Sequence, residues 1–125
     1  MKLHTYHLSC IDVKGCYEEM FKNCTCLTEA PELPATELNI YCYKSMFEGC
    51  IRLIKPPKLP AIKLTMECYA YMFQGCTRLI EPPKLPATEI EQGCYKYMFD
   101  GCKSLMNAPE LPATKLGFSC YEGMF

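Results

Sequence analysis

The stretch CYKSMFEGCIRLIKPPKLPAIKLTME, residues 42–67, decides the fold because the chain repeats it. Residues 68–93 read CYAYMFQGCTRLIEPPKLPATEIEQG and residues 94–119 read CYKYMFDGCKSLMNAPELPATKLGFS. An earlier copy spans residues 16–41, and CYEGMF at 120–125 opens a fifth. Ten positions are identical in all four full copies, namely Cys42, Tyr43, Met46, Phe47, Cys50, Leu53, Pro57, Leu59, Pro60 and Ala61 in the quoted one. Repetition at a fixed period of 26 residues predicts one structural unit stacked on copies of itself.

Length and charge narrow the classes of protein to which the chain can belong. Its 125 residues carry 13 Lys and Arg against 14 Asp and Glu, a net charge of −1. This balance lacks the basic surface that binders of nucleic acids or anionic membranes need. No segment has the length of a membrane span, and Met1 to Val13 lacks the apolar core of a signal peptide. We expect an N-terminal segment with a partial first helix at 1–15 and one repeat domain at 16–125, with units 16–41, 42–67, 68–93, 94–119 and a partial unit 120–125.

Spacing within a unit predicts a helix followed by a strand. Leu38, Cys42, Met46 and Cys50 recur every four residues, as on one helical face. Gly49, Gly75 and Gly101, with Asn23 in the same place, fit the left-handed position that follows a helix. Leu53 to Pro56 predicts a brief strand that passes into a polyproline-like chain. The expected fold is α/β: a right-handed solenoid with short parallel strands on one side and short helices on the other.

Charged positions predict the register of the stack. Glu37, Lys63, Glu89 and Lys115 occupy one position in successive copies and alternate in sign. Glu29, Lys55 and Glu81 do the same. Stacking in step would place opposite charges side by side, although chance alternation on a solvated face is the alternative. Because each exposed pair is worth only ~0–1 kcal/mol, the Leu, Phe and Met rows must supply the stability.

The string CYxxMFxGCxxLxxxPxLPATxL, which covers residues 16–125, resembles the BspA-like branch of the leucine-rich repeats. Units of that family carry an aromatic residue followed by Gly-Cys, then Leu, then a strand that ends in Pro; Phe47, Gly49, Cys50, Leu53, Leu59 and Pro60 match this pattern. The resemblance implies a leucine-rich-repeat solenoid that acts in adhesion and protein binding and is not an enzyme. It also implies a secreted or cell-surface protein of host-associated bacteria or some protozoa. Since no signal peptide is present, we expect the chain to be a fragment of such a protein.

The 11 cysteines allow two interpretations. In a helix, Cys42 and Cys50 would stand ~12 Å apart, too far for a disulfide. We therefore expect two columns of buried free thiols that behave as small hydrophobic side chains, with a ladder of disulfides as the alternative. Cys10 and Cys26, with His4 and His7, contain enough ligands for a zinc ion. The preferred expectation is no metal and no cofactor, with an ordinary N-terminal segment and an incidental thiol pair.

Catalytic patterns are missing from the sequence. The two histidines precede the first full unit, no phosphate-binding glycine motif occurs, and the carboxylates belong to repeating positions. Since a repeat supplies copies rather than one unique site, we expect no enzyme. Tyrosines at positions 17, 43, 69, 95 and 121 should have partly buried rings and solvated hydroxyls. Tyr71 and Tyr97 are expected to be exposed and able to contact a partner.

Two sets of positions vary while their neighbours are constant, as a binding surface would. They are Glu29, Lys55, Glu81 and Asn107, and Glu32, Lys58, Lys84 and Glu110. Any solvated surface would show the same variation. The function predicted is an adhesive, protein-binding repeat module that recognises a host-matrix or cell-surface protein. The alternative is a self-assembling structural repeat, because without polar capping units the copies could associate end to end into homo-oligomers.

Overall fold

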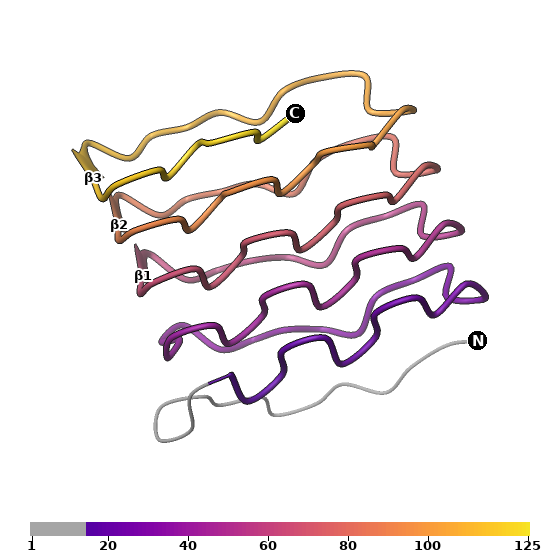
Figure 1. Ribbon diagram of the computed structural model, residues 1–125, viewed down its shortest axis with the longest axis horizontal. Helices are drawn as coiled ribbons and strands as arrows, with labels where there is room; N and C mark the ends of the chain where they lie inside the picture. Colours follow the sequence, from indigo (N-terminus) through magenta and orange to yellow (C-terminus); the bar gives the residue numbers. More distant parts are fainter. Residues whose placement is uncertain (1–14) are drawn as a thin grey trace.

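The computed structural model describes residues 15–125, and in it successive copies lie side by side, each running out along one layer and back along another (Figure 1). Three short strands, β1 (Lys63–Leu64), β2 (Glu89–Ile90) and β3 (Lys115–Leu116), form a parallel sheet in the order β1-β2-β3. Lys63 pairs with Glu89 and Glu89 with Lys115, so each copy is displaced from the next by one full repeat. The prediction of stacking in register is therefore confirmed for the described residues.

The predicted helices are wrong. Between residues 15 and 125 the structure contains no helix, and the segments expected to be helical are runs of consecutive turns. We call these segments the turn ribbons; they comprise residues 15–24, 41–50, 67–76, 93–102 and 119–124. They form one layer of the molecule, and the strands lie at the edge where this layer joins the other half of each copy (Figure 1).

Backbone hydrogen bonds in a turn ribbon alternate between two directions. In residues 41–50, the amides of even-numbered residues donate to the carbonyl three positions back, as Met46 does to Tyr43 at 3.1 Å. The amides of odd-numbered residues donate to the next copy, as Phe47 does to Met72 at 3.0 Å. Half of the amides thus close turns and half join copies, so the buried backbone is satisfied without any helix. An α-helix would use every amide within its own copy and would leave none to join copies.

Left-handed backbone conformations recur every four residues along each ribbon. Gly49, Gly75 and Gly101 have φ of 75°, 75° and 77°, and Asn23 has φ of 60°. The prediction of left-handed conformation at these positions is confirmed, although they are the third residues of tight turns and do not follow helices. The positions four and eight residues earlier are also left-handed, and all except Gly15 and Gly93 hold larger side chains, such as Tyr71 with φ of 58°.

The other half of each copy is an extended chain, and here the predicted strand was misplaced. Near Leu53 to Pro56 the structure has only an isolated parallel bridge between Glu29 and Lys55. The named strands begin eight or more residues later, beyond the prolines, because proline has no amide hydrogen to donate to a neighbouring strand. We call residues 27–38, 53–64, 79–90 and 105–116 the extended segments.

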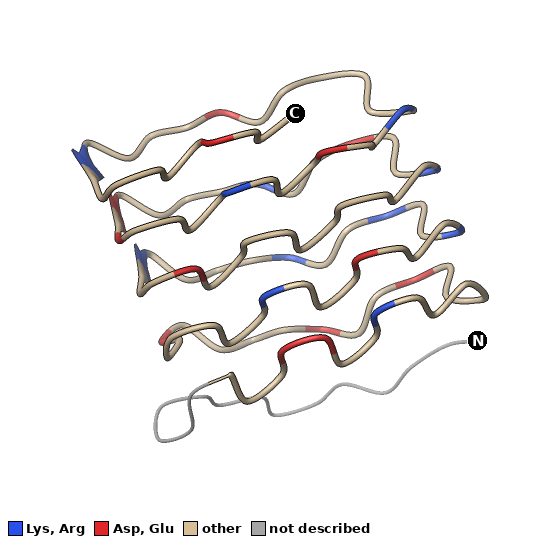
Figure 2. Cartoon of the chain, viewed as in Figure 1, with Lys and Arg blue, Asp and Glu red and all other residues tan. Residues whose placement is uncertain are grey.

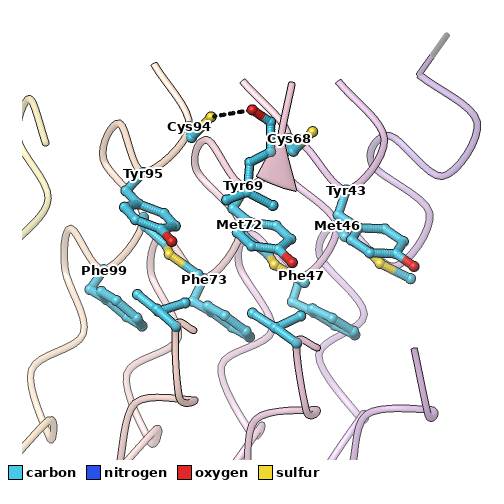
Figure 3. Packing of buried hydrophobic residues seen from close by; sticks show 14 of the residues in the cluster. Tyr43, Met46, Phe47, Cys68, Tyr69, Met72, Phe73, Cys94, Tyr95 and Phe99 are labelled. Carbon is cyan, nitrogen blue, oxygen red and sulfur yellow. Dashed lines mark hydrogen bonds between the residues drawn. The ribbon is translucent and has the colours of Figure 1, made fainter. Parts of the chain in front are cut away.

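The interior is made of columns, by which we mean the side chains that occupy one position in successive copies. Phe47, Phe73 and Phe99 stack with ring centroids 5.7 and 5.8 Å apart, and Met72 is fully buried beside them (Figure 3). Leucines of the extended segments close the other side of the core; Leu53, Leu59, Leu79 and Leu85 are all buried. The expectation that apolar rows form the interior is confirmed.

The alternating charges lie in register as predicted. Lys63 Nζ is 3.9 Å from Glu89 Oε2, and Lys115 Nζ is 3.3 Å from Glu89 Oε1. Glu37 bridges Lys63 through its backbone. Both lysine side chains are more than three-quarters exposed, so these ion pairs contribute little to stability.

Candidate protein-binding surface

All eight residues predicted to bind a partner are exposed on the extended segments. They are Glu29, Glu32, Lys55, Lys58, Glu81, Lys84, Asn107 and Glu110. The charged ones colour the rear layer of the trace in Figure 2. Residues that separate them in the sequence, such as Leu59 and Ala61, turn inward and are buried. The extended chain therefore presents variable side chains outward over an invariant interior.

Shallow clefts bring some of these residues together. One cleft of about 510 Å³ has Lys84 and Glu110 in its lining, and its walls are the prolines of two adjacent extended segments. A second of about 360 Å³ contains Lys55 and Glu81 together with Ile54 and Ile80. The prolines explain these clefts, because amides that could join the segments are missing there. The clefts are lined by carbon surface with a charged group at the rim.

The basic side chains of the described residues divide into two groups by location. Five lysines form ion pairs, and all lie on a turn ribbon or at the strands: Lys22, Lys44, Lys63, Lys96 and Lys115. The distances run from 3.0 Å for Lys22 to Glu48 up to 3.9 Å for Lys63 to Glu89. The remaining basic residues form no ion pair with any residue from 15 to 125: Arg52, Lys55, Lys58, Arg78, Lys84 and Lys103. All six are exposed on the extended segments or on the loops that lead into them.

The cysteine columns do more than fill space. Cys50 Sγ donates to the Phe21 carbonyl at 3.1 Å, and Cys76 Sγ to the Phe47 carbonyl at 3.1 Å. Cys94 Sγ likewise donates to the Thr65 carbonyl at 3.0 Å. Each thiol therefore joins its own copy to the preceding one. A serine could make the same bond, but its hydroxyl costs more to bury than a thiol.

Burial keeps these thiols protonated. It raises the pKa of Cys50 and of Cys102 to about 11, and raises that of Cys76 and Cys94 further. Desolvation of the thiolate is the largest cause in each case. These groups are poor nucleophiles, because the thiolate is the reactive form.

Nine of the ten described cysteines are free, as predicted, but Cys42 is not. Cys42 forms a disulfide bond, which corrects the expectation for that residue. Another assumption was wrong, because a turn ribbon does not have the helical rise from which the distance between Cys42 and Cys50 was predicted. No ladder of disulfides forms within residues 15–125 even so.

The tyrosine hydroxyls were predicted to be solvated, and this prediction is wrong for most of them. Tyr43, Tyr69 and Tyr95 are each only 1% exposed, and their rings stack with centroids 6.2 and 6.1 Å apart (Figure 3). The hydroxyls of these three and of Tyr121 are buried and have no hydrogen-bond partner among residues 15–125. The sequence could not distinguish this arrangement, because a tyrosine fits both a wet boundary and a full interior.

Tyr71 and Tyr97 were expected to be exposed, but both are half-buried. Their rings stack on each other with centroids 5.4 Å apart. The backbone of Gly123 covers the far side of Tyr97, since a β-carbon built there would lie 2.3 Å from the ring. This pair therefore has a structural role, and it offers a partner little of its ring faces.

The metal hypothesis finds no support in the described part of the chain. Cys26 is exposed, as expected, but His4, His7 and Cys10 lie outside the described residues. From residue 15 onward no three His, Cys, Asp or Glu side chains gather where they could hold a metal ion.

Comparisons with known proteins assign the chain to no group: no protein family, curated protein or solved structure matches it. In residues 15–125 no helix is present that could cross a lipid bilayer. The interpretation of function therefore depends on the surface itself.

Sequence reasoning missed part of that surface. It did not single out Arg52, Arg78 or Lys103, and it did not include Ile54 and Ile80, which are 39% and 42% exposed. The signal was available for the two arginines, because both occupy one column in adjacent copies. The absence of ion pairs around them could be found only from coordinates.

Proposed function

We propose that the chain is a protein-binding repeat module that recognises its partner through the outer face of the extended segments. Further, the copies form a right-handed solenoid of the leucine-rich-repeat kind, with turn ribbons in the place of helices. On this proposal the resemblance to BspA-like repeats reflects common descent, and the parent protein is an adhesive protein at the cell surface or secreted. The chain acts as a binder and not as an enzyme.

One observation carries this proposal: the exposed columns of the extended segments that hold charged residues vary, while the leucine columns beside them do not. Positions 58 and 59 illustrate it, because the exposed column reads Glu, Lys, Lys, Glu, whereas the column beside it reads Leu in every copy and is buried in the first three. Identical interiors hold the copies at constant spacing. The outer side chains are then free to be chosen for a partner, as in other stacked-repeat proteins.

Charge reversal on this face tests the proposal. Saturable binding to immobilised extracellular-matrix and cell-surface proteins would be measured by surface plasmon resonance for the unchanged chain and for a triple variant, Lys55→Glu, Lys58→Glu and Lys84→Glu. We expect a protein that binds the unchanged chain and loses affinity for the triple variant. The matched control, Lys63→Glu with Lys115→Glu, changes equally exposed side chains at the strands and should keep its affinity. Equal affinity of the unchanged chain and the triple variant would exclude this face.

Self-assembly is a second candidate, favoured by the surface at the C-terminal copy. Phe118 is 79% exposed, Met106 76% and Phe125 59%. The amides of Tyr121 and Gly123 have no acceptor among the described residues, whereas the corresponding amides of earlier copies bond to the next copy. Such an edge favours pairing with another chain. Light scattering against concentration tests this function, and a mass that stays monomeric at all concentrations would exclude it.

A further inference from the structure

The unpaired basic residues of the two central copies show what kind of partner the proposed surface would take. Lys58 and Lys84 occupy the same column in adjacent copies, so two like charges lie side by side. In the remaining columns of charged residues on the extended segments, charged residues in adjacent copies always have opposite signs. Like charges directly opposite each other destabilise stacked strands. A departure from a rule that the other charged columns of the extended segments obey is typical of a functional site.

Acidic neighbours do not compensate this pair. Glu32 precedes Lys58 in the column and Glu110 follows Lys84, yet neither forms an ion pair with its lysine in residues 15–125. Lys84 and Glu110 instead line the same proline-walled cleft, which separates them. At the strands, by contrast, Lys115 reaches Glu89 in the adjoining copy at 3.3 Å. The difference leaves the amino groups of Lys58 and Lys84 available to an external anion.

Other unpaired cations and apolar side chains surround this pair. Lys55, Arg52 and Arg78 belong to the same two copies. The acidic residues on the extended segments of these copies are Glu81 and Glu89, and Glu89 pairs with Lys63 and Lys115 at the strands. Ile54 and Ile80 form an exposed apolar row beside Lys55 and share a cleft with it. An acidic polymer without apolar groups would leave this row exposed to water, whereas a peptide could cover it. The chemistry of the surface therefore matches a peptide with both acidic and apolar side chains.

We infer that the outer face of the two central copies binds a short acidic peptide segment, with carboxylates on Lys58 and Lys84 and apolar side chains on Ile54 and Ile80. This inference rests on the proposed function and names its partner class. An extended peptide advances ~3.3 Å per residue, so carboxylates two residues apart span ~6.6 Å. Side chains in neighbouring copies lie a similar distance apart, since ring centroids in the aromatic columns are separated by 5.7–6.2 Å. A Glu-x-Glu pattern lying across the copies therefore meets one lysine in each.

The test uses a short fluorescein-labelled peptide in which a Glu-Gly-Glu segment is joined through glycines to a Leu-Gly-Leu segment, so that both carboxylates and both leucines can face the surface, with fluorescence anisotropy as the readout. The unchanged chain should bind it saturably, with affinity that falls as NaCl is raised. The double variant Lys58→Gln with Lys84→Gln should bind at least about fivefold more weakly, the loss expected for two exposed ion pairs. The control Lys63→Gln with Lys115→Gln removes the same number of exposed charges from the strands and should keep its affinity.

Three outcomes would overturn the inference. They are failure of the unchanged chain to bind the peptide, equal losses in both double variants, and equal binding of a peptide with Gln in place of Glu. Saturable binding of heparin without binding of the peptide would assign the lysines to sulfated glycans and would also overturn it. If the peptide fails while the charge-reversal triple variant still weakens binding to a matrix protein, only this inference fails and the proposed function stands. Thermal unfolding of each variant establishes that it is folded before binding is measured.

Discussion

Replacing Tyr69 by phenylalanine should stabilise the protein. Tyr69 lies in the middle of its column, 1% exposed, between the rings of Tyr43 and Tyr95. Its hydroxyl is buried and makes no hydrogen bond to any residue in the described part of the chain. Phenylalanine keeps the ring and therefore keeps both stacking contacts.

The size of the effect follows from two opposing contributions. A buried hydroxyl without a partner costs ~1–3 kcal/mol relative to its place in water, and the substitution removes that cost. The space left by one oxygen atom is smaller than a methyl group, so the cavity contributes less than ~1 kcal/mol in the other direction. We expect a net gain of ~1–2 kcal/mol in the free energy of unfolding. Burial also raises the pKa of Tyr69 well above its usual value, as expected for a hydroxyl removed from water.

Urea unfolding followed by circular dichroism measures this gain as a higher midpoint at an unchanged slope. Tyr43→Phe and Tyr95→Phe repeat the experiment in almost the same surroundings and should give gains of similar size. Tyr71→Phe is the matched control, because Tyr71 is half-buried and its hydroxyl is not among the buried unpartnered groups. That variant should change stability by less than ~0.5 kcal/mol. A loss of stability in Tyr69→Phe and its two repeats would refute the reasoning, because it would mean that the hydroxyls have partners.

Three further changes test the interior and the ribbons. Phe73→Ala should lower the free energy of unfolding, measured in urea, by ~3–5 kcal/mol, because Phe73 is fully buried and stacked on both sides. The control Phe125→Ala should lower it far less, because Phe125 is 59% exposed. A loss under ~1 kcal/mol for Phe73→Ala would contradict the stacked core. In thermal unfolding, Gly75→Asn should be nearly neutral, because Asn tolerates the φ of 75° and Gly101 in the next copy has no side chain beside it. Gly75→Val should be clearly destabilising, because Val does not tolerate this conformation. Equal losses of stability in the two variants would contradict the left-handed assignment. Burial raises the pKa of Cys50 to about 11, so its thiol contributes stability that is complete below the unfolded pKa near 9 and is lost as pH rises towards 11. The Cys50→Ala variant should therefore show a smaller decline in Tm from pH 9 to 11 than the unchanged chain. A decline of the same size in both would contradict this assignment.

The repeat, its register and most of the interior could be predicted from the sequence because they depend only on the period. Any structure that stacks identical units in step aligns Glu37 with Lys63 and Phe47 with Phe73, whatever the local conformation. The eight candidate binding residues were likewise predictable as exposed positions. Their pairing was not, since whether Lys84 reaches Glu110 depends on a cleft between two proline-rich segments.

Helix and turn ribbon were confused because both bury every fourth residue over a short stretch. The sequence contained one discriminating signal. In an α-helix, residues four apart are offset by ~40°, so the row of Cys42, Met46 and Cys50 would wind ~80° around the axis. All three of these residues are nevertheless fully buried. A strict period of four within the ribbon therefore favours a repeating turn over a helix.

The residue types at the left-handed positions did not provide a second sequence signal for a turn ribbon. A ribbon needs a positive φ every fourth residue, and glycine or asparagine would mark each such position if backbone preference alone decided. Only the last left-handed position of each ribbon, typified by Gly75, follows that rule in every copy; Glu67 and Tyr71 hold the earlier ones of the same ribbon. In the first three ribbons each left-handed residue is held by a bond from its own amide to the next copy, as Tyr71 is to Lys96 at 2.8 Å. The contacts between copies therefore stabilise a backbone that one copy alone would not favour, and the fold belongs to the stack and not to the single repeat.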